Sequence, residues 1–248
     1  MFENLLIEIA LIVFIFGIMI GSFLNVVIYR IPKGESIAFP ASKCQSCQTP
    51  LKWWHNIPLF SWLLLRGKCH FCKEKISVQY PMVELLTGII FVALYFKLGL
   101  VWHLPFVAAS FAALLALVMI DFEYMAVPDN VNFAALVLAL VQPDFLMGLL
   151  YAAIAAGGLY LIGLLSSFIA KREAMGGADV IVAGTMGALL GFPNFFVAIF
   201  LSALLAMIPA LIWREKGVPF VPFLALATFI VYLYDRQALE LLEIIIYG

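Results

Sequence analysis

Long apolar stretches recur along almost all of the 248 residues, and this feature restricts the fold more than any other. Hydrophobic residues make up 65% of the sequence and charged residues only 12%, with a mean hydropathy of +1.10. Soluble domains are about half apolar, so a water-soluble globule is excluded. Because backbone polar groups in a bilayer must be paired internally, the stretches predict an all-α, polytopic membrane helix bundle.

Eight segments approach the length of about 20 apolar residues that crosses a bilayer as a helix. They cover approximately residues 5–28, 82–100, 104–120, 129–143, 147–170, 179–191, 194–212 and 218–234. The chain is therefore expected to contain a first transmembrane helix (1–29), a polar loop (30–80), a transmembrane domain (81–235) and a short interfacial tail (236–248).

Lys and Arg are concentrated in the 30–80 loop, which holds eight of the 14 basic residues. Cytoplasmic loops carry this excess, so the loop is predicted to face the cytoplasm and both termini the outer side of a bacterial inner membrane. Only Lys97 and Arg236 then lie outside. Four further basic residues fall inside with the loop: Lys171, Arg172, Arg214 and Lys216.

Two CxxC pairs within the loop, separated by 21 residues, predict a zinc site. Two disulfides are the alternative, which a reducing cytoplasm disfavours. Four thiolates leave no open position for water, so the zinc is expected to be structural. His55 and His70 are alternative ligands, although solvated loop positions fit them better. The predicted ligands are Cys44, Cys47, Cys69 and Cys72.

The aromatic residues of the loop have two interpretations. Trp53, Trp54, Phe60 and Trp62 either form a small hydrophobic core or contact the membrane interface, where tryptophan is enriched.

Two aspartates at the ends of apolar segments are candidate catalytic residues, because an ionisable group beside a span is costly and therefore often functional. Asp121 follows one apolar run and Asp179 precedes another, and the eight-span threading places both at the same membrane boundary. A pair of poorly solvated carboxylates shares a proton, which gives one acid and one base. The pair therefore predicts an aspartic peptidase.

Alternatives to this dyad remain open. Asp179 stands at a plausible N-cap and Asp129 begins a helix after Pro128, so capping would also account for aspartates there. Glu123 is the local rival of Asp121. A serine peptidase is disfavoured because the sequence has neither a GxSxG motif nor a histidine inside the bundle, and no HExxH motif is present.

Several motifs together resemble the type IV prepilin peptidase family. Gly21 to Pro32 is similar to the family's first-helix signature, the CxxC pairs to its zinc loop, and Tyr80 to Gly88 to the segment that enters its second helix. Asp121 with Pro128-Asp129 resembles the first catalytic motif, and Pro219 to Phe223 the late PFxPF segment.

One motif departs from the family pattern. Asp179 matches the aspartate of GxGD, but Ala178 replaces the second glycine and Ile181 the usual lysine. An alanine removes backbone freedom without adding charge.

The resemblance implies an aspartic endopeptidase that removes leader peptides from prepilins or pseudopilins on the cytoplasmic side. It also implies methylation of the new N-terminus by S-adenosylmethionine, with Glu84 and residues 25–30 as weak candidates for substrate or cofactor contacts. Membrane lipid is the other expected partner, and no nucleic acid is expected. The alternative function is a membrane scaffold or transporter subunit with a zinc docking loop, but a transporter would bury charges near mid-bilayer.

Overall fold

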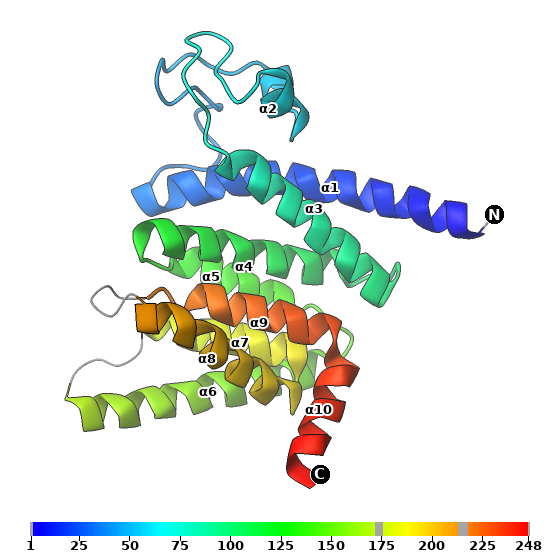
Figure 1. Ribbon diagram of the computed structural model, residues 1–248, viewed down its shortest axis with the longest axis vertical. Helices are drawn as coiled ribbons and strands as arrows, with labels where there is room; N and C mark the ends of the chain where they lie inside the picture. Colours follow the sequence, from blue (N-terminus) through cyan, green and yellow to red (C-terminus); the bar gives the residue numbers. More distant parts are fainter. Residues whose placement is uncertain (1, 172–175, 213–217, 248) are drawn as a thin grey trace. The chain divides into compact units, whose positions relative to one another are not determined.

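The computed structural model describes residues 2–171, 176–212 and 218–247, and in these ranges its regular structure is helical apart from two isolated β-bridges (Figure 1). Arg172, Arg214 and Lys216, which entered the charge count, lie outside the described residues. The chain forms two compact units, residues 1–100 and 101–248, and each is described by itself.

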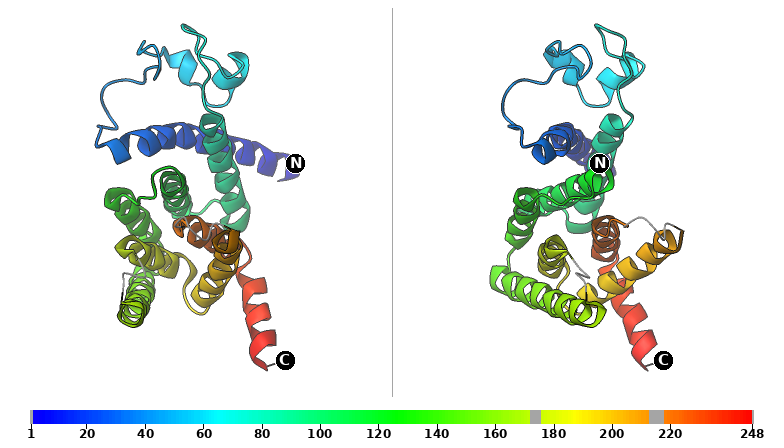
Figure 2. Two further views of the ribbon diagram at one scale, coloured as in Figure 1. Left: turned by 60° about the vertical axis from the view of Figure 1, so that its left-hand side comes forward. Right: turned by 90° about the vertical axis from the view of Figure 1, so that its left-hand side faces the viewer.

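The first unit consists of two long helices joined by a loop. Helices α1 (Phe2–Arg30) and α3 (Gln79–Leu98) cross each other (Figure 2). Glycines bring their backbones together: a Cβ on Gly17 would lie 2.8 Å from Gly88 Cα, and one on Gly21 2.7 Å from Glu84 Cα. Membrane helices associate through such small residues. The loop contains the short helices η1 (Ile31–Lys33), η2 (Trp53–Asn56) and α2 (Phe60–Leu64).

The second unit is a bundle around four helices. Helices α4 and α7 each pack against both α5 and α9, so α5 and α9 bridge them. Helix α6 covers α7, α8 packs on α9, and α10 follows α9 at the end of the chain (Figure 1). The bounds are α4 (Leu104–Tyr124), α5 (Asp129–Leu140), α6 (Phe145–Ala170), α7 (Gly177–Leu190), α8 (Asn194–Ile212), α9 (Val221–Leu233) and α10 (Asp235–Tyr247).

Each of the eight expected segments contains a helix, which confirms the predicted all-helical polytopic fold. Helices α1, α3, α4, α6 and α8 are long and apolar enough to cross a membrane. Helices α5, α7 and α9 have 12, 14 and 13 residues, and at about 1.5 Å per residue they fall short of a hydrocarbon core of about 30 Å. Neighbouring helices enclose α7, since its residues 182–189 are all buried.

The helix bounds also differ from those expected. Helix α4 continues to Tyr124 instead of stopping before Asp121, so Asp121 lies within its last turn. Its end is set by Met125, which adopts a left-handed conformation with φ of 51°. Because this C-cap is not a glycine, no pattern in the sequence predicted it.

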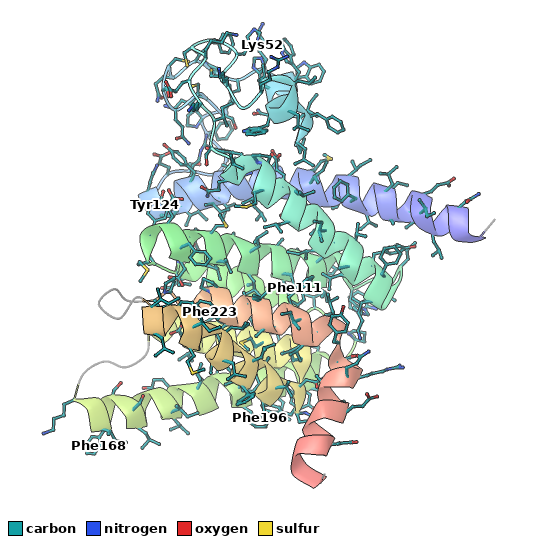
Figure 3. All side chains as sticks on the ribbon, in the orientation of Figure 1. Lys52, Phe111, Tyr124, Phe168, Phe196 and Phe223 are labelled. Carbon is teal, nitrogen blue, oxygen red and sulfur yellow. The ribbon has the colours of Figure 1, made fainter. Side chains whose placement is uncertain are left out.

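The outer helices present apolar side chains to their surroundings. Phe168 on α6 and Phe196 on α8 are 85% and 59% exposed, whereas Phe111 inside the bundle is 3% exposed (Figure 3). Apolar exteriors of this kind match lipid rather than water, so the protein is a multi-pass membrane protein.

Candidate active site and metal centre

The four loop cysteines converge as the sequence predicted. Their Sγ atoms all lie within 4.8 Å of one another, and those of Cys44 and Cys72 are 3.8 Å apart. Zn–S bonds of about 2.3 Å in a tetrahedron place sulfurs about 3.8 Å apart. All four cysteines are free, so the cluster fits a tetrahedral metal site after only a small contraction of its longest separation.

The backbone of the two knuckles explains this convergence. Cys44 N–H donates to Thr49 O at 3.0 Å, and Gln48 N–H donates to Cys44 O at 2.9 Å. The second knuckle repeats both bonds 25 residues later, and the residue after each second cysteine, Gln48 or Lys73, has a φ near 60°. Two copies of one turn therefore present their thiols to a common point.

The loop has little hydrophobic core of its own. Among the described side chains of residues 31–78, Cys69 is the one buried hydrophobic residue, at 3% exposed. Trp62 packs on Gly67 and donates its Nε1–H to Ile76 O at 3.3 Å, whereas Trp53 is 76% exposed. A metal would therefore supply the stability that a core gives elsewhere.

The thiols also influence one another's ionisation. A hydrogen bond with the Thr49 hydroxyl lowers the pKa of Cys47 to about 6. A backbone hydrogen bond from Glu74 acts in the same direction on Cys72, but burial and the neighbouring thiols outweigh it and raise the pKa of Cys72 to about 11. Metals bind thiolates, and a divalent cation would offset the repulsion among several of them.

His55 and His70 are neighbours of each other and lie outside the cysteine cluster. Their ring centroids are 5.1 Å apart, and His55 Nδ1 accepts the Lys52 N–H at 3.3 Å. Burial, followed by the positive charges of His70 and Lys52, holds the pKa of His55 below its ordinary value. The cysteines alone therefore complete the candidate metal site.

Buried polar residues of α1 and α3 anchor the loop. Glu84 accepts the Leu59 N–H of the loop at 2.7 Å, and Asn25 joins α1 to the first turn of α3, where the loop ends, by donating to Tyr80 O at 3.0 Å. The Arg30 guanidinium donates to two loop carbonyls at 2.9 and 2.8 Å. These residues were weak candidates for substrate or cofactor contacts, and the structure gives each of them an anchoring contact.

Asp121 lies in the last turn of α4 and is 6% exposed. Its carboxylate interacts with the backbone N–H of Val221, the first residue of α9. Glu123, its local rival, and Asp129 are both exposed. Among these three acidic residues, only Asp121 faces the interior of the bundle.

Asp179 is the third residue of α7, so the alternative that it occupies the N-cap is wrong, because Gly176 is the N-cap. The Asp179 carboxylate turns back to the Gly176 N–H, as N3 acidic residues do. The negative charge of Asp121 acts directly on Asp179. The fold thus brings together two carboxylates that are 58 positions apart in sequence.

The two aspartates differ in their positions relative to the ends of their helices. Asp179 lies in a first helical turn, where the helix dipole favours negative charge. Asp121 lies in a last turn, where the dipole opposes it. Asp121 instead interacts with the first N–H of α9, so a structural role is available to Asp179 in its own helix and to Asp121 at the start of the neighbouring one.

The sequence did not predict a role for two residues at this site. Val221 contributes only its backbone N–H, so its side chain carries no signal. Asn132 is fully buried and donates its Nδ2–H to Ala178 O at 2.9 Å. An asparagine within an apolar helix was a detectable signal, but nothing in the sequence showed what it would face.

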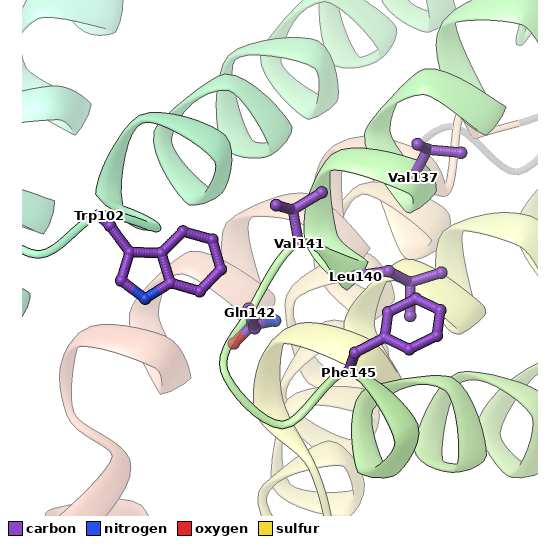
Figure 4. Close-up of a pocket in the computed structure, with 6 residues that line it drawn as sticks. All are labelled: Trp102, Val137, Leu140, Val141, Gln142 and Phe145. Carbon is purple, nitrogen blue, oxygen red and sulfur yellow. The ribbon is translucent and has the colours of Figure 1, made fainter.

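An open cavity of about 460 Å³ lies at the other end of α5 (Figure 4). Its lining is almost entirely apolar and includes neither Asp121 nor Asp179, so it is separate from the candidate active site. The lining residues are Trp102, Val137, Leu140, Val141, Gln142 and Phe145.

The fold and site define a multi-pass membrane protein with a four-cysteine loop and a pair of aspartates, of which Asp121 is buried and Asp179 half-buried. Residues 15–98 match the bacterial peptidase A24 N-terminal domain, and residues 108–211 match the type IV leader peptidase family. The chain belongs to this family of type IV leader peptidases, which confirms the resemblance seen in the sequence.

Three relatives share the name prepilin leader peptidase/N-methyltransferase. The protein from Neisseria gonorrhoeae is 33% identical over an alignment of 234 positions, and the match covers 82% of each chain. The one from Xanthomonas campestris pv. campestris is 31% identical over 90% of this chain and 91% of its own. The one from Aeromonas hydrophila is 33% identical over 90% and 89%, respectively. No solved structure matches the chain significantly.

Proposed function

We propose that this protein removes the leader peptide of type IV prepilins or pseudopilins and that Asp121 and Asp179 are its catalytic residues. The observation that carries the proposal is that both carboxylates belong to one helical unit, in which the charge of Asp121 acts on Asp179. That unit contains the segment similar to the type IV leader peptidase family.

The chemistry follows from two carboxyl groups sharing one proton. The ionised carboxylate removes a proton from a water molecule, which attacks the scissile carbonyl carbon. The protonated partner donates a hydrogen bond to the carbonyl oxygen and stabilises the charge that develops there. Protonation of the leaving amine then breaks the C–N bond, and no covalent enzyme intermediate is required.

The reaction is proposed to take place at the cytoplasmic face of a bacterial inner membrane. The support is the concentration of eight basic residues in the 30–80 loop, which is typical of cytoplasmic loops. We also propose that the cysteine cluster in this loop holds one structural zinc ion, with Cys44, Cys47, Cys69 and Cys72 as its ligands.

A second activity is proposed from the names of the relatives, which include N-methyltransferase. S-adenosylmethionine would supply the methyl group for the amine that cleavage releases. This step requires a methyl donor and a free amine but no activated water. It is therefore expected to survive loss of either aspartate when a pre-cleaved substrate is supplied.

The test is cleavage of a purified prepilin by Asp121→Asn and by Asp179→Asn, followed by mass spectrometry. Asparagine keeps the shape of aspartate and still accepts hydrogen bonds, but it cannot act as a base. Each variant should lose on the order of 100-fold or more in rate. Glu123→Gln, which alters an exposed carboxylate two residues from Asp121, is the control and should cleave normally. Full cleavage by either Asn variant would remove that aspartate from the mechanism.

A further inference from the structure

We propose that Asn132 is a positioning residue for Asp179, which rests on the proposed function of Asp179 as a catalytic carboxylate. Asn132 is on α5, the helix that packs against both α4 and α7 (Figures 1 and 2). Its Nδ2–H bonds Ala178 O at 2.9 Å, and Ala178 immediately precedes Asp179. The side-chain amide therefore holds the turn of α7 from which Asp179 projects.

The bond to Ala178 is one of two that fix α7 along α5. At the other end of the helix pair, Gln142 donates its Nε2–H to Ala188 O at 3.1 Å. Both bonds join an amide side chain from the α5 segment to a carbonyl of α7, and both link residues 46 positions apart. Together they define the register of α7, but only the Asn132 bond lies beside Asp179.

Asn132 also costs stability, which indicates a role other than packing. Its side chain is fully buried, and its Oδ1 atom has no hydrogen-bond partner among the described residues. A buried acceptor without a partner is destabilising, whereas an apolar residue of the same size would avoid that cost. The amide at position 132 is therefore better explained by the placement of the first turn of α7 than by the stability of the bundle.

Each aspartate has a contact from a bridging helix, directly to the carboxylate of Asp121 and through the preceding backbone carbonyl for Asp179. Helix α9 directs the Val221 N–H at Asp121, and helix α5 directs the Asn132 amide at the residue before Asp179. Acid and base must keep their mutual geometry through the reaction, and a misplacement of about 1 Å costs on the order of 100-fold in rate. Asn132 is the side chain that fixes Asp179 in this pair.

The first experiment measures kcat and KM for prepilin cleavage by the full-length protein in detergent micelles. Asn132→Leu, which cannot donate to Ala178, should lose about tenfold or more in kcat, with KM and thermal stability close to wild type. The matched control is Gln142→Leu, which removes the equivalent bond at the far end of α7. It should keep the wild-type kcat even if its stability falls.

A second variant, Asn132→Asp, has a distinctive pH profile. When protonated, the new carboxylic acid donates to Ala178 O as the amide does; when ionised, it has no donor and repels that carbonyl. The ratio of its kcat to that of wild type should therefore fall about tenfold or more as the pH rises and a buried carboxylic acid ionises. If Asn132→Leu does not fold, this ratio alone decides the question.

The outcomes separate this inference from the proposed function. Wild-type kcat in Asn132→Leu, or a constant ratio across pH in Asn132→Asp, would overturn the role of Asn132 while leaving the peptidase intact. Equal losses of kcat in Asn132→Leu and Gln142→Leu would also overturn it, since both would then act through stability alone. A wild-type protein that does not cleave prepilin would overturn the proposed function, and the role of Asn132 with it.

Discussion

Replacement of Gly187 by alanine should loosen the packing of α7, the helix that carries Asp179, against α6. A Cβ at position 187 would lie 2.5 Å from Tyr151 O and 2.6 Å from Ala155 Cβ. Ordinary van der Waals contact requires the added Cβ to lie about 0.8 Å farther from these atoms. Protein interiors are packed as densely as crystals, so the neighbouring atoms cannot shift aside at little cost. The two helices must therefore move apart.

The expected size of the effect combines two opposing contributions. Overpacking of a close contact costs about 1–3 kcal/mol, and replacing glycine by alanine within a helix returns up to about 1 kcal/mol. With the full return, the net loss in the free energy of unfolding should be about 0–2 kcal/mol, which is at most a factor of about 30 in the folded to unfolded ratio.

Gly158→Ala on α6 is the matched control. No atom lies within 4 Å of a Cβ at this exposed position, so the same substitution should be neutral or slightly stabilising. The assay is equilibrium unfolding in mixed micelles with increasing sodium dodecyl sulfate, followed by circular dichroism. If Gly187→Ala is as stable as Gly158→Ala, the proposed close approach of α6 and α7 is refuted.

Two further predictions concern the loop. By elemental analysis, the wild-type protein should contain about one zinc ion per chain. Cys72→Ser should lose most of this zinc, whereas Ser46→Ala, a change within the same motif at a residue that is not a ligand, should retain it. Zinc that persists in Cys72→Ser would contradict the assigned ligands. Glu84→Leu removes the acceptor of the Leu59 N–H, so this amide should exchange with deuterium faster by about tenfold, because the lost bond contributes about 1–3 kcal/mol. Unchanged exchange at Leu59 would show that Glu84 does not anchor the loop.

Much of this protein could be predicted from short-range patterns in the sequence. Membrane helices can be recognised in a sequence because each must pair its own backbone hydrogen-bonding groups and present an apolar surface. The cysteine spacing likewise predicted the cluster, since a CxxC turn is a local structure that brings two thiols together without help from the rest of the fold. The two aspartates were found because charged residues are rare in such a chain. Each charged residue beside a membrane-spanning segment can therefore be examined individually.

Other features depended on tertiary structure. The meeting of Asp121 and Asp179 required the packing of α4 and α7 against the same two helices, and the sequence supported only the weaker expectation that both lie at one boundary. The N-cap at Gly176 was missed because both glycine and aspartate suit that position, and the choice between them depends on where the chain enters the bundle.

The sequence by itself therefore determined the class of fold, the cluster of four cysteines and the choice of two candidate aspartates, because each rests on local composition or spacing. Only the tertiary structure decided what surrounds those aspartates. Asn132 and the Val221 N–H lie at the candidate active site through contacts between helices far apart in the chain. Such contacts depend on which faces of the helices pack together, and helices that are apolar all round do not encode this in their periodicity.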